Sequence, residues 1–142
     1  GVEMAFDLGT TPLLVSANPF SLEEVILNLL TNARDAVEER GQTGLPPPPQ
    51  IVVRVLTEGE GAEQRVRVEV LDQGAGIPEA ILDQVFDPFF TTKSPDRGTG
   101  LGLSISKALV EEVGGSLAIQ STVGQGTQVS LSLPAASPPR AP

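Results

Sequence analysis

A glycine-rich segment that runs directly into an amphipathic segment places the strongest constraint on how this chain folds. Residues 96–107 read DRGTGLGLSISK, with glycine at positions 98, 100 and 102. Glycines allow backbone N–H groups to approach a ligand closely, and the first turn of a helix adds unpaired N–H groups and a positive dipole end. The segment therefore predicts a loop followed by a helix over residues 101–113. It is either a structural turn or a binding site for a phosphate chain.

A longer helix is predicted over residues 19–40, ending at Gly41, with Asn18 or Ser21 as its N-cap. Apolar side chains recur along one side of this segment, as expected for a helix that covers a core. This apolar stripe consists of Leu22, Val25, Ile26, Leu29, Leu30, Ala33, Ala36 and Val37.

A strip of polar residues lies beside that stripe. Asn28, Asn32 and Asp35 are spaced four and three residues apart, so they project from the same side of the helix. Asn and Asp are poor helix formers because their side chains compete for the backbone. The strip is therefore either a polar helix edge or a binding surface.

Alternation of apolar and polar residues predicts two antiparallel hairpins, and short apolar runs near the start predict one or two edge strands. These segments are residues 1–18, 51–56, 65–71, 116–122 and 127–133. A short helix is predicted at 78–84. Proline-rich sequence connects the first helix to the second strand at 42–50, and residues 134–142 are expected to form a flexible Pro/Ala-rich tail.

The predicted strand over residues 65–71 is followed by an acidic residue, Asp72, which begins a loop that reads DQGAGIP. An ionised carboxylate can only accept hydrogen bonds, so its natural partner in a pocket is an N–H group such as an exocyclic amine. A strand-terminal turn is the alternative interpretation, since Asp and Gly are common in turns. Neither glycine-rich loop matches the G-x-G-x-x-G or Walker A patterns.

Three of the five phenylalanines fall within residues 86–93, which read FDPFFTTK. Such a cluster is expected to anchor a loop to the core. The residues that follow, 91–99, are polar and rich in helix breakers, which is typical of a mobile segment. Lys93 and Arg97 lie on this segment, either as solvated charges or as groups that face a ligand.

Composition limits the possible partners. The net charge of −9 argues against binding to nucleic acid, and a phosphate ligand would have to be held by backbone N–H groups, a cation or a few placed basic residues. The chain has no cysteine and no histidine. Disulfides, thiolate or histidine metal sites, histidine-dependent catalysis and phosphorylation on its own histidine are therefore excluded. No apolar run is long enough to span a membrane.

Four motifs in fixed order give the chain a family resemblance: Asn28-Leu-Leu-Thr-Asn32 on a helix, DQGAGI at 72–77, FDPFFTTK at 86–93 and GTGLGL at 98–103. Together they resemble the N box, first glycine box, F box and second glycine box of the catalytic, ATP-binding domain of two-component sensor histidine kinases. This family belongs to the group that includes gyrase, HSP90 and MutL. The resemblance implies an α+β fold over residues 1–133. It would be a two-layer, Bergerat-type α/β sandwich in which three helices cover one face of a mixed, mostly antiparallel sheet, with an ATP lid.

The resemblance also implies ATP and Mg²⁺ as cofactors. Asp72 would accept a hydrogen bond from the adenine amino group, Gly76 would give the base room, and Thr127 would be the last contact on the adenine side. Asn32 would hold Mg²⁺ through its amide oxygen.

The phosphates would be bound by the backbone N–H groups of Gly98, Gly100, Leu101 and Gly102. Lys93 is a candidate for contacting the γ-phosphate. The remaining residues that the resemblance places around the nucleotide are Asn28, Asp35, Gly74, Ile77, Thr99 and Leu103. Many histidine kinases carry a basic residue where this chain has Asp35, which leaves the role of Asp35 open between the base and the waters around the metal.

Asn28 distinguishes among the branches of the group. The gyrase, HSP90 and MutL branches have a glutamate there that polarises the attacking water, and Asn cannot act as a general base near neutral pH. The resemblance therefore implies an enzyme, a protein histidine kinase catalytic domain, that transfers the γ-phosphate to a histidine on a separate dimerisation domain absent from this sequence. Residues Asn28 and Lys93 are the expected catalytic residues.

The expected partners are ATP or ADP, that histidine-containing domain and, indirectly, the receiver domain of a response regulator. Nucleic acid and membrane contacts are not expected, and the fragment should be a cytoplasmic monomer even if the full protein is membrane-anchored. The alternatives are a nucleotide-binding regulatory module without kinase activity, a gyrase- or HSP90-type ATPase, and a serine kinase of the anti-sigma type.

Overall fold

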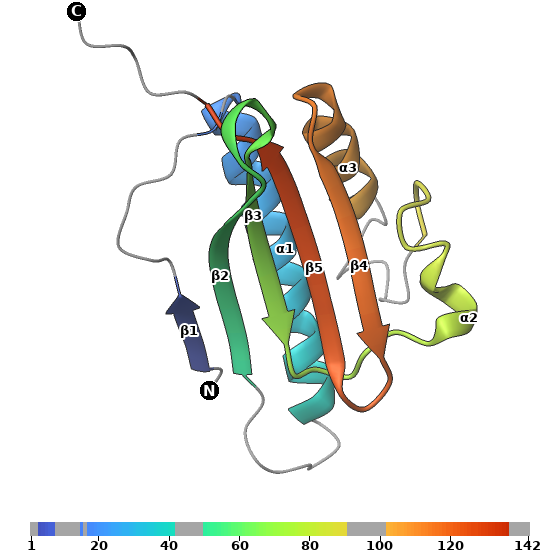
Figure 1. Ribbon diagram of the computed structural model, residues 1–142. Coiled ribbons are helices and arrows are strands. Elements are labelled where there is room, and N and C mark those ends of the chain that lie inside the picture. Colours follow the sequence, from blue (N-terminus) through green and yellow to red (C-terminus); the bar gives the residue numbers. More distant parts are fainter. Residues whose placement is uncertain (1–2, 8–14, 16, 42–49, 91–101, 137–142) are drawn as a thin grey trace, which may run out of the picture.

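The computed structural model describes residues 3–7, 15, 17–41, 50–90 and 102–136. Figure 1 follows the order of the elements along the chain. They are β1 (Glu3–Asp7), α1 (Pro19–Gly41), β2 (Gln50–Glu58), the short 3-10 helix η1 (Gly61–Glu63), β3 (Arg65–Asp72), α2 (Glu79–Leu82), α3 (Gly102–Glu112), β4 (Ser116–Thr122) and β5 (Gly126–Pro134). The strands and helices expected from the sequence are all present, with ends that shift by no more than two residues.

The strands form one mixed sheet in the order β1-β2-β3-β5-β4. β1 runs parallel to β2, whereas β2–β3, β3–β5 and β4–β5 are antiparallel pairs. The parallel pair requires a long crossover, and α1 lies in that connection. β3 is the middle strand, so the residue that ends it, Asp72, has a neighbouring strand on both sides (Figure 1).

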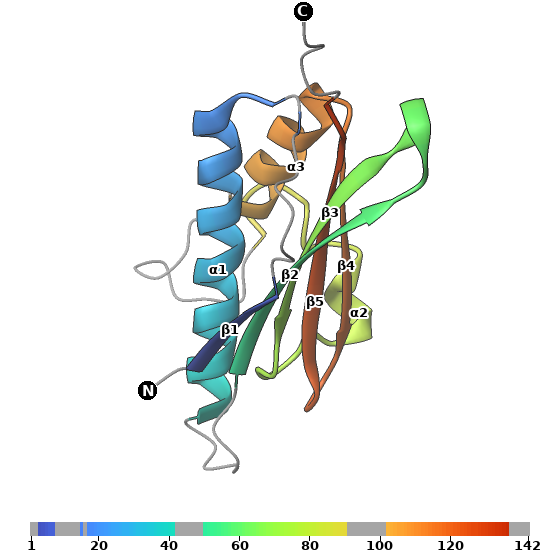
Figure 2. The same cartoon turned by 60° about the vertical axis from the view of Figure 1, so that its left-hand side comes forward.

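Helices α1 and α3 pack against one face of the sheet, while the single turn of α2 lies beside the edge strand β4 (Figures 1 and 2). The core lies between these two layers. Its buried members are Val25, Leu29, Ala33, Val37, Ile51, Val70, Val110, Leu117, Val129, Leu131 and Leu133. The predicted two-layer α+β sandwich is therefore confirmed.

Helix α1 begins where the sequence provides a cap. The side-chain oxygen of Asn18 accepts hydrogen bonds from the backbone N–H groups of Phe20, at 2.9 Å, and Ser21, at 3.3 Å. Asn18 is therefore the N-cap, and Ser21 lies inside the helix. The residues of α1 that are fully buried, Val25, Leu29, Ala33 and Val37, all belong to the predicted stripe, and the other four members of the stripe are partly buried. Each buried Val or Leu contributes about 1.5–3 kcal/mol relative to an exposed one, so tertiary packing holds this helix in place.

The opposite face of the sheet carries a polar network. Glu69 on β3 is only 7% exposed, although the alternation pattern places it away from the core. Its carboxylate accepts from Gln128 at 2.9 Å and pairs with Arg67 at 3.1 Å. Arg67 also pairs with Glu58 at 2.9 Å. Glu69 is therefore covered by Gln128 on the neighbouring strand β5 and by Arg67 on its own strand, and Arg67 compensates its charge.

Strand β5 extends beyond the expected domain boundary at residue 133. It includes Pro134, and the backbone N–H of Ala135 donates to the carbonyl of Gln64 at 2.9 Å. Ala135 also forms an isolated bridge with Val15. Residues 137–142, most of the expected tail, lie outside the described residues. None of the helices in the described part of the chain has the length and apolar character needed to cross a membrane.

Candidate functional site

The candidate site centres on Asp72 at the end of β3. Asp72 is only 8% exposed, and it lies opposite Ile51 on one side and Thr127 on the other. Its Oδ1 accepts a hydrogen bond from the backbone N–H of Gly74 at 2.9 Å. Burial raises the pKa of the carboxyl from 3.8 to about 6 by removing water, against the effect of backbone hydrogen bonds from Gly74 and Thr127. Burial therefore destabilises the ionised form of Asp72 unless its carboxylate accepts hydrogen bonds from further donors.

The loop after Asp72 is fixed to helix α1 through its backbone. The N–H of Ala75 donates to the carbonyl of Ala36 at 3.1 Å, and Arg40 donates to the carbonyl of Gln73 at 2.9 Å. A Cβ on Gly74 would lie 2.6–2.7 Å from atoms of Ala36. Glycine at this position therefore permits the close contact between loop and helix, and the sequence alone did not assign it that role.

The same loop is also fixed to the turn between β4 and β5. The N–H of Gly124 donates to the carbonyl of Ala75 at 2.9 Å, and the N–H of Ile77 donates to the hydroxyl of Ser121 at 2.8 Å. Gly76 has a φ of +80°, and a Cβ there would collide with the carbonyl of Thr122. Gly76 is therefore required by backbone conformation and packing, in addition to any room that it gives a ligand.

The hydroxyl of Thr127 lies beside this loop. Thr127 is 9% exposed and is the register partner of Asp72 across the β3–β5 pair. Its Oγ1 is 2.7 Å from the Oγ of Ser121. Gly126, just before it, has a φ of +128° and passes so close to Asp72 that a Cβ would overlap the Asp72 carbonyl. Ser121 and Gly126 belong to the site, but no motif identified Ser121, because it sits at the end of an otherwise ordinary strand.

The residues of the polar strip of α1 have different surroundings in the structure. Asn28 is half-buried, and its Nδ2 donates to Ser106 Oγ on α3 at 3.2 Å. Asn32 is also half-buried. Asp35 pairs with the exposed Arg34 at 3.4 Å. The strip thus faces α3 at Asn28, next to the start of the helix that follows the glycine-rich segment.

Helix α3 begins at Gly102, followed by the half-buried Leu103. A Cβ on Gly102 would meet no heavy atom of the described chain within 4 Å. Packing among the described residues therefore does not require a glycine at this position. The other phosphate-side residues predicted from the sequence, Lys93, Gly98, Thr99, Gly100 and Leu101, lie outside the described residues.

The phenylalanine cluster anchors its loop less completely than expected. Phe86 packs against the core, and the ammonium of Lys107 lies 5.0 Å from the centre of its ring. Phe90 is half-buried, whereas Phe89 is 73% exposed with a φ of +67°. The cluster expected to anchor the loop does so through Phe86 and in part through Phe90, whereas Phe89 lies in a turn that the N–H of Phe90 closes on the carbonyl of Asp87 at 3.2 Å, with its ring exposed.

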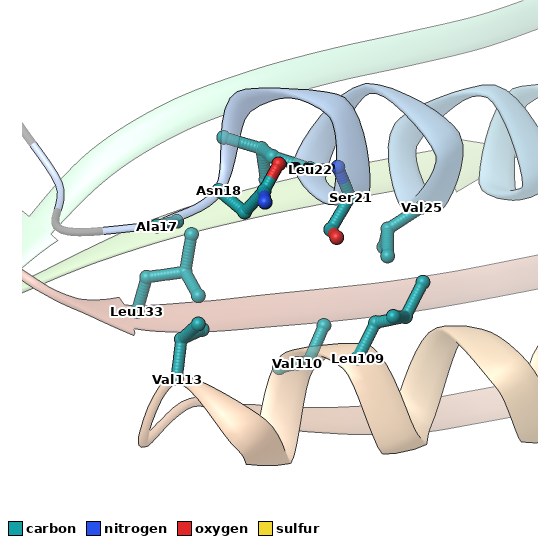
Figure 3. Close-up of a pocket in the computed structure, with 9 residues that line it drawn as sticks. All are labelled: Ala17, Asn18, Ser21, Leu22, Val25, Leu109, Val110, Val113 and Leu133. Atoms are coloured by element: carbon teal, nitrogen blue, oxygen red, sulfur yellow. Dashed lines mark hydrogen bonds between the residues drawn. The ribbon is translucent and has the colours of Figure 1, made fainter.

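A shallow, mainly apolar recess lies at the far end of the molecule, between the start of α1 and the end of α3 (Figure 3). Its lining includes Ala17, Leu22, Val113 and Leu133. Leu133 is at the opposite end of β5 from Thr127, so this recess is separate from the site at Asp72.

Comparison with known proteins supports a specific family. The family model described as "Histidine kinase-, DNA gyrase B-, and HSP90-like ATPase" matches residues 17–137. The chain is 38% identical over 142 residues to the "Sensor kinase CckA" of Brucella abortus, a match that covers 94% of this chain and 14% of that protein. It is 39% identical over 140 residues to the "Two-component sensor PprA" of Pseudomonas aeruginosa, covering 99% of this chain and 14% of that protein. The chain thus spans only a small part of the curated relatives that it matches.

Solved structures agree with the sequence relatives. The mycobacterial sensor histidine kinase MprB superposes with a TM-score of 0.75 at 29% identity, covering 94% of this chain and 82% of that one. Full-length ShkA in complex with AMPPNP gives a TM-score of 0.77 at 25% identity, covering 97% of this chain and 26% of that one. The chain belongs to the histidine kinase-, DNA gyrase B- and HSP90-like ATPase family, in which it is similar to the catalytic domains of sensor histidine kinases.

Proposed function

We propose that this domain binds Mg·ATP and presents the γ-phosphate for transfer to a histidine on a separate dimerisation domain of a two-component sensor kinase. The observation that carries the proposal is the buried carboxylate of Asp72 at the end of the middle strand. A buried acceptor needs donors, and the exocyclic amine of adenine supplies an N–H group. Family membership and the ShkA complex with AMPPNP, an analogue of ATP, support the same ligand class.

The phosphate end of the nucleotide is assigned to the start of α3. The unpaired N–H groups of a helix N-terminus favour anions, and α3 follows directly on the glycines at 98 and 100. The described chain gives no packing reason for Gly102, and close approach of a phosphate to the backbone supplies one. Lys93 and the backbone of residues 98–101 are proposed to complete this end.

The metal is assigned to Asn32. An amide oxygen is among the hard oxygen ligands that Mg²⁺ accepts, and Asn32 lies one helical turn beyond Asn28 on α1. When bound, the cation would neutralise phosphate charge that a domain with a net charge of −9 cannot balance alone. Asn32 would then connect the nucleotide to the helix that buries the core stripe.

Asn28 favours transfer to a protein acceptor over hydrolysis. Its amide cannot remove a proton from water near neutral pH, and one of its two N–H groups donates to Ser106. A gyrase- or HSP90-type ATPase would hydrolyse ATP measurably, whereas phosphoryl transfer to an imidazole depends chiefly on positioning and charge neutralisation. The proposed acceptor therefore lies on another domain, since this sequence contains no histidine.

Calorimetric titration of the 142-residue domain with ADP and AMPPNP, with and without Mg²⁺, tests the nucleotide site. Asp72→Ala should abolish binding, and Asn32→Ala should remove most of the Mg²⁺ dependence. Asp83→Ala is the matched control, because Asp83 is an exposed acid on the short turn after α2. If the folded wild type binds neither nucleotide, the nucleotide-binding proposal is wrong.

Adding the histidine-bearing helices of a parent kinase in trans tests the transfer step. Labelled ATP should leave acid-labile label on those helices and none on this domain. If nucleotide binds but no label is transferred, the regulatory module without kinase activity becomes the better description. Rapid release of inorganic phosphate without any acceptor would instead favour the ATPase alternative.

A further inference from the structure

Three hydrogen bonds converge on the hydroxyl of Ser121, the second-last residue of β4. The backbone N–H of Ile77 lies 2.8 Å from Oγ. The carbonyl oxygen of Gly126 lies 3.0 Å away, and the hydroxyl oxygen of Thr127 lies 2.7 Å away. Ser121 therefore joins the loop after Asp72 to the first residues of β5.

The number of protons decides how these bonds are made. A serine hydroxyl has one proton to donate and two lone pairs with which to accept. The N–H of Ile77 can only donate, so it uses one lone pair, and the carbonyl of Gly126 can only accept, so it takes the proton. The remaining lone pair then accepts the proton of Thr127. All three hydrogen bonds can form at the same time only when Thr127 donates its proton to Ser121.

This arrangement leaves Thr127 without a proton for any other partner. Its oxygen can still accept, and so can the carboxylate of its register partner Asp72. Register partners on adjacent strands point to the same face of the sheet, and both residues are buried on the face that the helices cover. Two acceptors therefore lie side by side where the purine base is proposed to bind.

We infer that Ser121 is a positioning residue that fixes the Thr127 hydroxyl as an acceptor and thereby selects 6-aminopurine nucleotides over 6-oxopurine nucleotides. An amino group at C6 brings N–H donors to this pair of acceptors. A carbonyl at C6 brings a third acceptor, which leaves polar groups unpaired and opposed in a buried place. The inference rests on the proposed function and adds to it the origin of base selectivity.

Calorimetric titration with ADP and with inosine diphosphate tests this role, because inosine carries a carbonyl at C6. The wild type should bind ADP more tightly than inosine diphosphate. Ser121→Ala releases the Thr127 proton, which can then donate to the C6 carbonyl, so the preference for ADP should fall about five- to tenfold, the size of one hydrogen bond. Ser121→Thr keeps the hydroxyl and should retain the preference.

A double-mutant cycle separates positioning from general loosening of the loop. Thr127→Val removes the hydroxyl at similar shape and should lower the preference on its own. Adding Ser121→Ala to Thr127→Val should then lower it no further, because Ser121 acts only through Thr127. Ser116→Ala, an exposed serine at the other end of β4, is the control and should change nothing. Thermal melting confirms that each variant is folded.

The outcomes distinguish the two proposals. A wild type that binds ADP but whose preference is unchanged in folded Ser121→Ala overturns this inference alone. So does equal weakening of both nucleotides by Ser121→Ala, or a further loss of preference when it is added to Thr127→Val, since either result describes a purely structural serine. A wild type that binds neither nucleotide overturns the proposed function and, with it, this inference.

Discussion

The side-chain amide of Asn28 on α1 donates a hydrogen bond to the hydroxyl of Ser106 on α3, with Nδ2 and Oγ 3.2 Å apart. Ser106 is 0% exposed, so this bond lies inside the helix layer. It joins two residues that are 78 positions apart in the chain. This bond uses one of the two N–H groups of Asn28, which leaves its second N–H and its amide oxygen as the groups that can face a ligand or a water molecule. This hydrogen bond thus connects the Asn28–Asn32 segment of α1 to α3, the helix that follows the glycine-rich segment.

Ser106→Ala should lower the free energy of unfolding by about 1–2 kcal/mol, because the half-buried amide of Asn28 loses its partner. Urea denaturation of Ser106→Ala, Asn28→Ala and the double variant measures this effect. The two single changes should couple by about 1 kcal/mol, since both remove the same bond. Ser116→Ala should leave stability within about 0.5 kcal/mol of the wild type. Additive losses would mean that the two side chains do not interact.

Gly74→Ala should be strongly destabilising, by about 2–3 kcal/mol, because the added methyl group would lie 2.6–2.7 Å from Ala36 and force the loop off α1. Denaturation and nucleotide titration on the same variant should both show the loss. Gly61→Ala is the comparison, since its methyl group meets nothing within 4 Å among the described residues and only its φ of +61° is strained. That variant should lose about 1 kcal/mol and keep nucleotide binding. Equal losses in the two variants would argue against a contact at Ala36.

Gly102→Ala should separate stability from binding. The methyl group meets no described atom within 4 Å, and alanine is a better helix former than glycine. The free energy of unfolding should therefore be unchanged or higher by up to about 0.5 kcal/mol. If phosphates approach this backbone closely, ADP affinity should nevertheless fall about tenfold, or about 1.4 kcal/mol. Melting temperature and calorimetry on one preparation provide both readouts. Unchanged affinity would move the phosphates away from the first turn of α3.

Local patterns in the sequence predicted the framework of the site correctly. A 3.6-residue period identified the buried stripe of α1, and a two-residue period identified β2 and β3. Asp72 was recognisable because an acid ended an alternating strand at the start of a loop that contains two glycines. Periodicity reports which face of an element is apolar, and that information is local to the element.

Contacts between distant elements were not predictable in the same way. The pairing of Asn28 with Ser106 depends on how two helices cross, and the bonds of Ser121 depend on the β4–β5 register and on the path of the loop after Asp72. Glu69 lies on the polar side of its strand that the alternation predicts, but its burial comes from the long side chains of Arg67 on the same strand and Gln128 on β5. The exposure of Phe89 follows from a backbone turn that aromatic composition does not encode.

The raised pKa of Asp72 has a defined effect on stability. Because burial raises this pKa from 3.8 to about 6, the folded state binds the proton more tightly than the unfolded chain does. Between those two values the folded protein therefore holds more protons. The contribution of Asp72 to the free energy of unfolding consequently falls as the pH rises from about 4 to about 6, and it is lost above that range.

Asp72→Asn removes this titration while keeping an oxygen that can accept from Gly74. The stability of the wild type relative to Asp72→Asn should therefore fall by about 1 kcal/mol between about pH 5 and about pH 7.5. Urea denaturation of both proteins at the two pH values measures this change. The contributions of the other acidic residues are the same in both proteins and cancel in the difference. Ser116→Ala, which changes an exposed side chain that does not titrate, should give a difference that does not vary with pH. If the Asp72→Asn difference is also constant, the carboxyl of Asp72 is as well solvated in the folded protein as in the unfolded chain, and an adenine amine would gain no advantage from a desolvated acceptor.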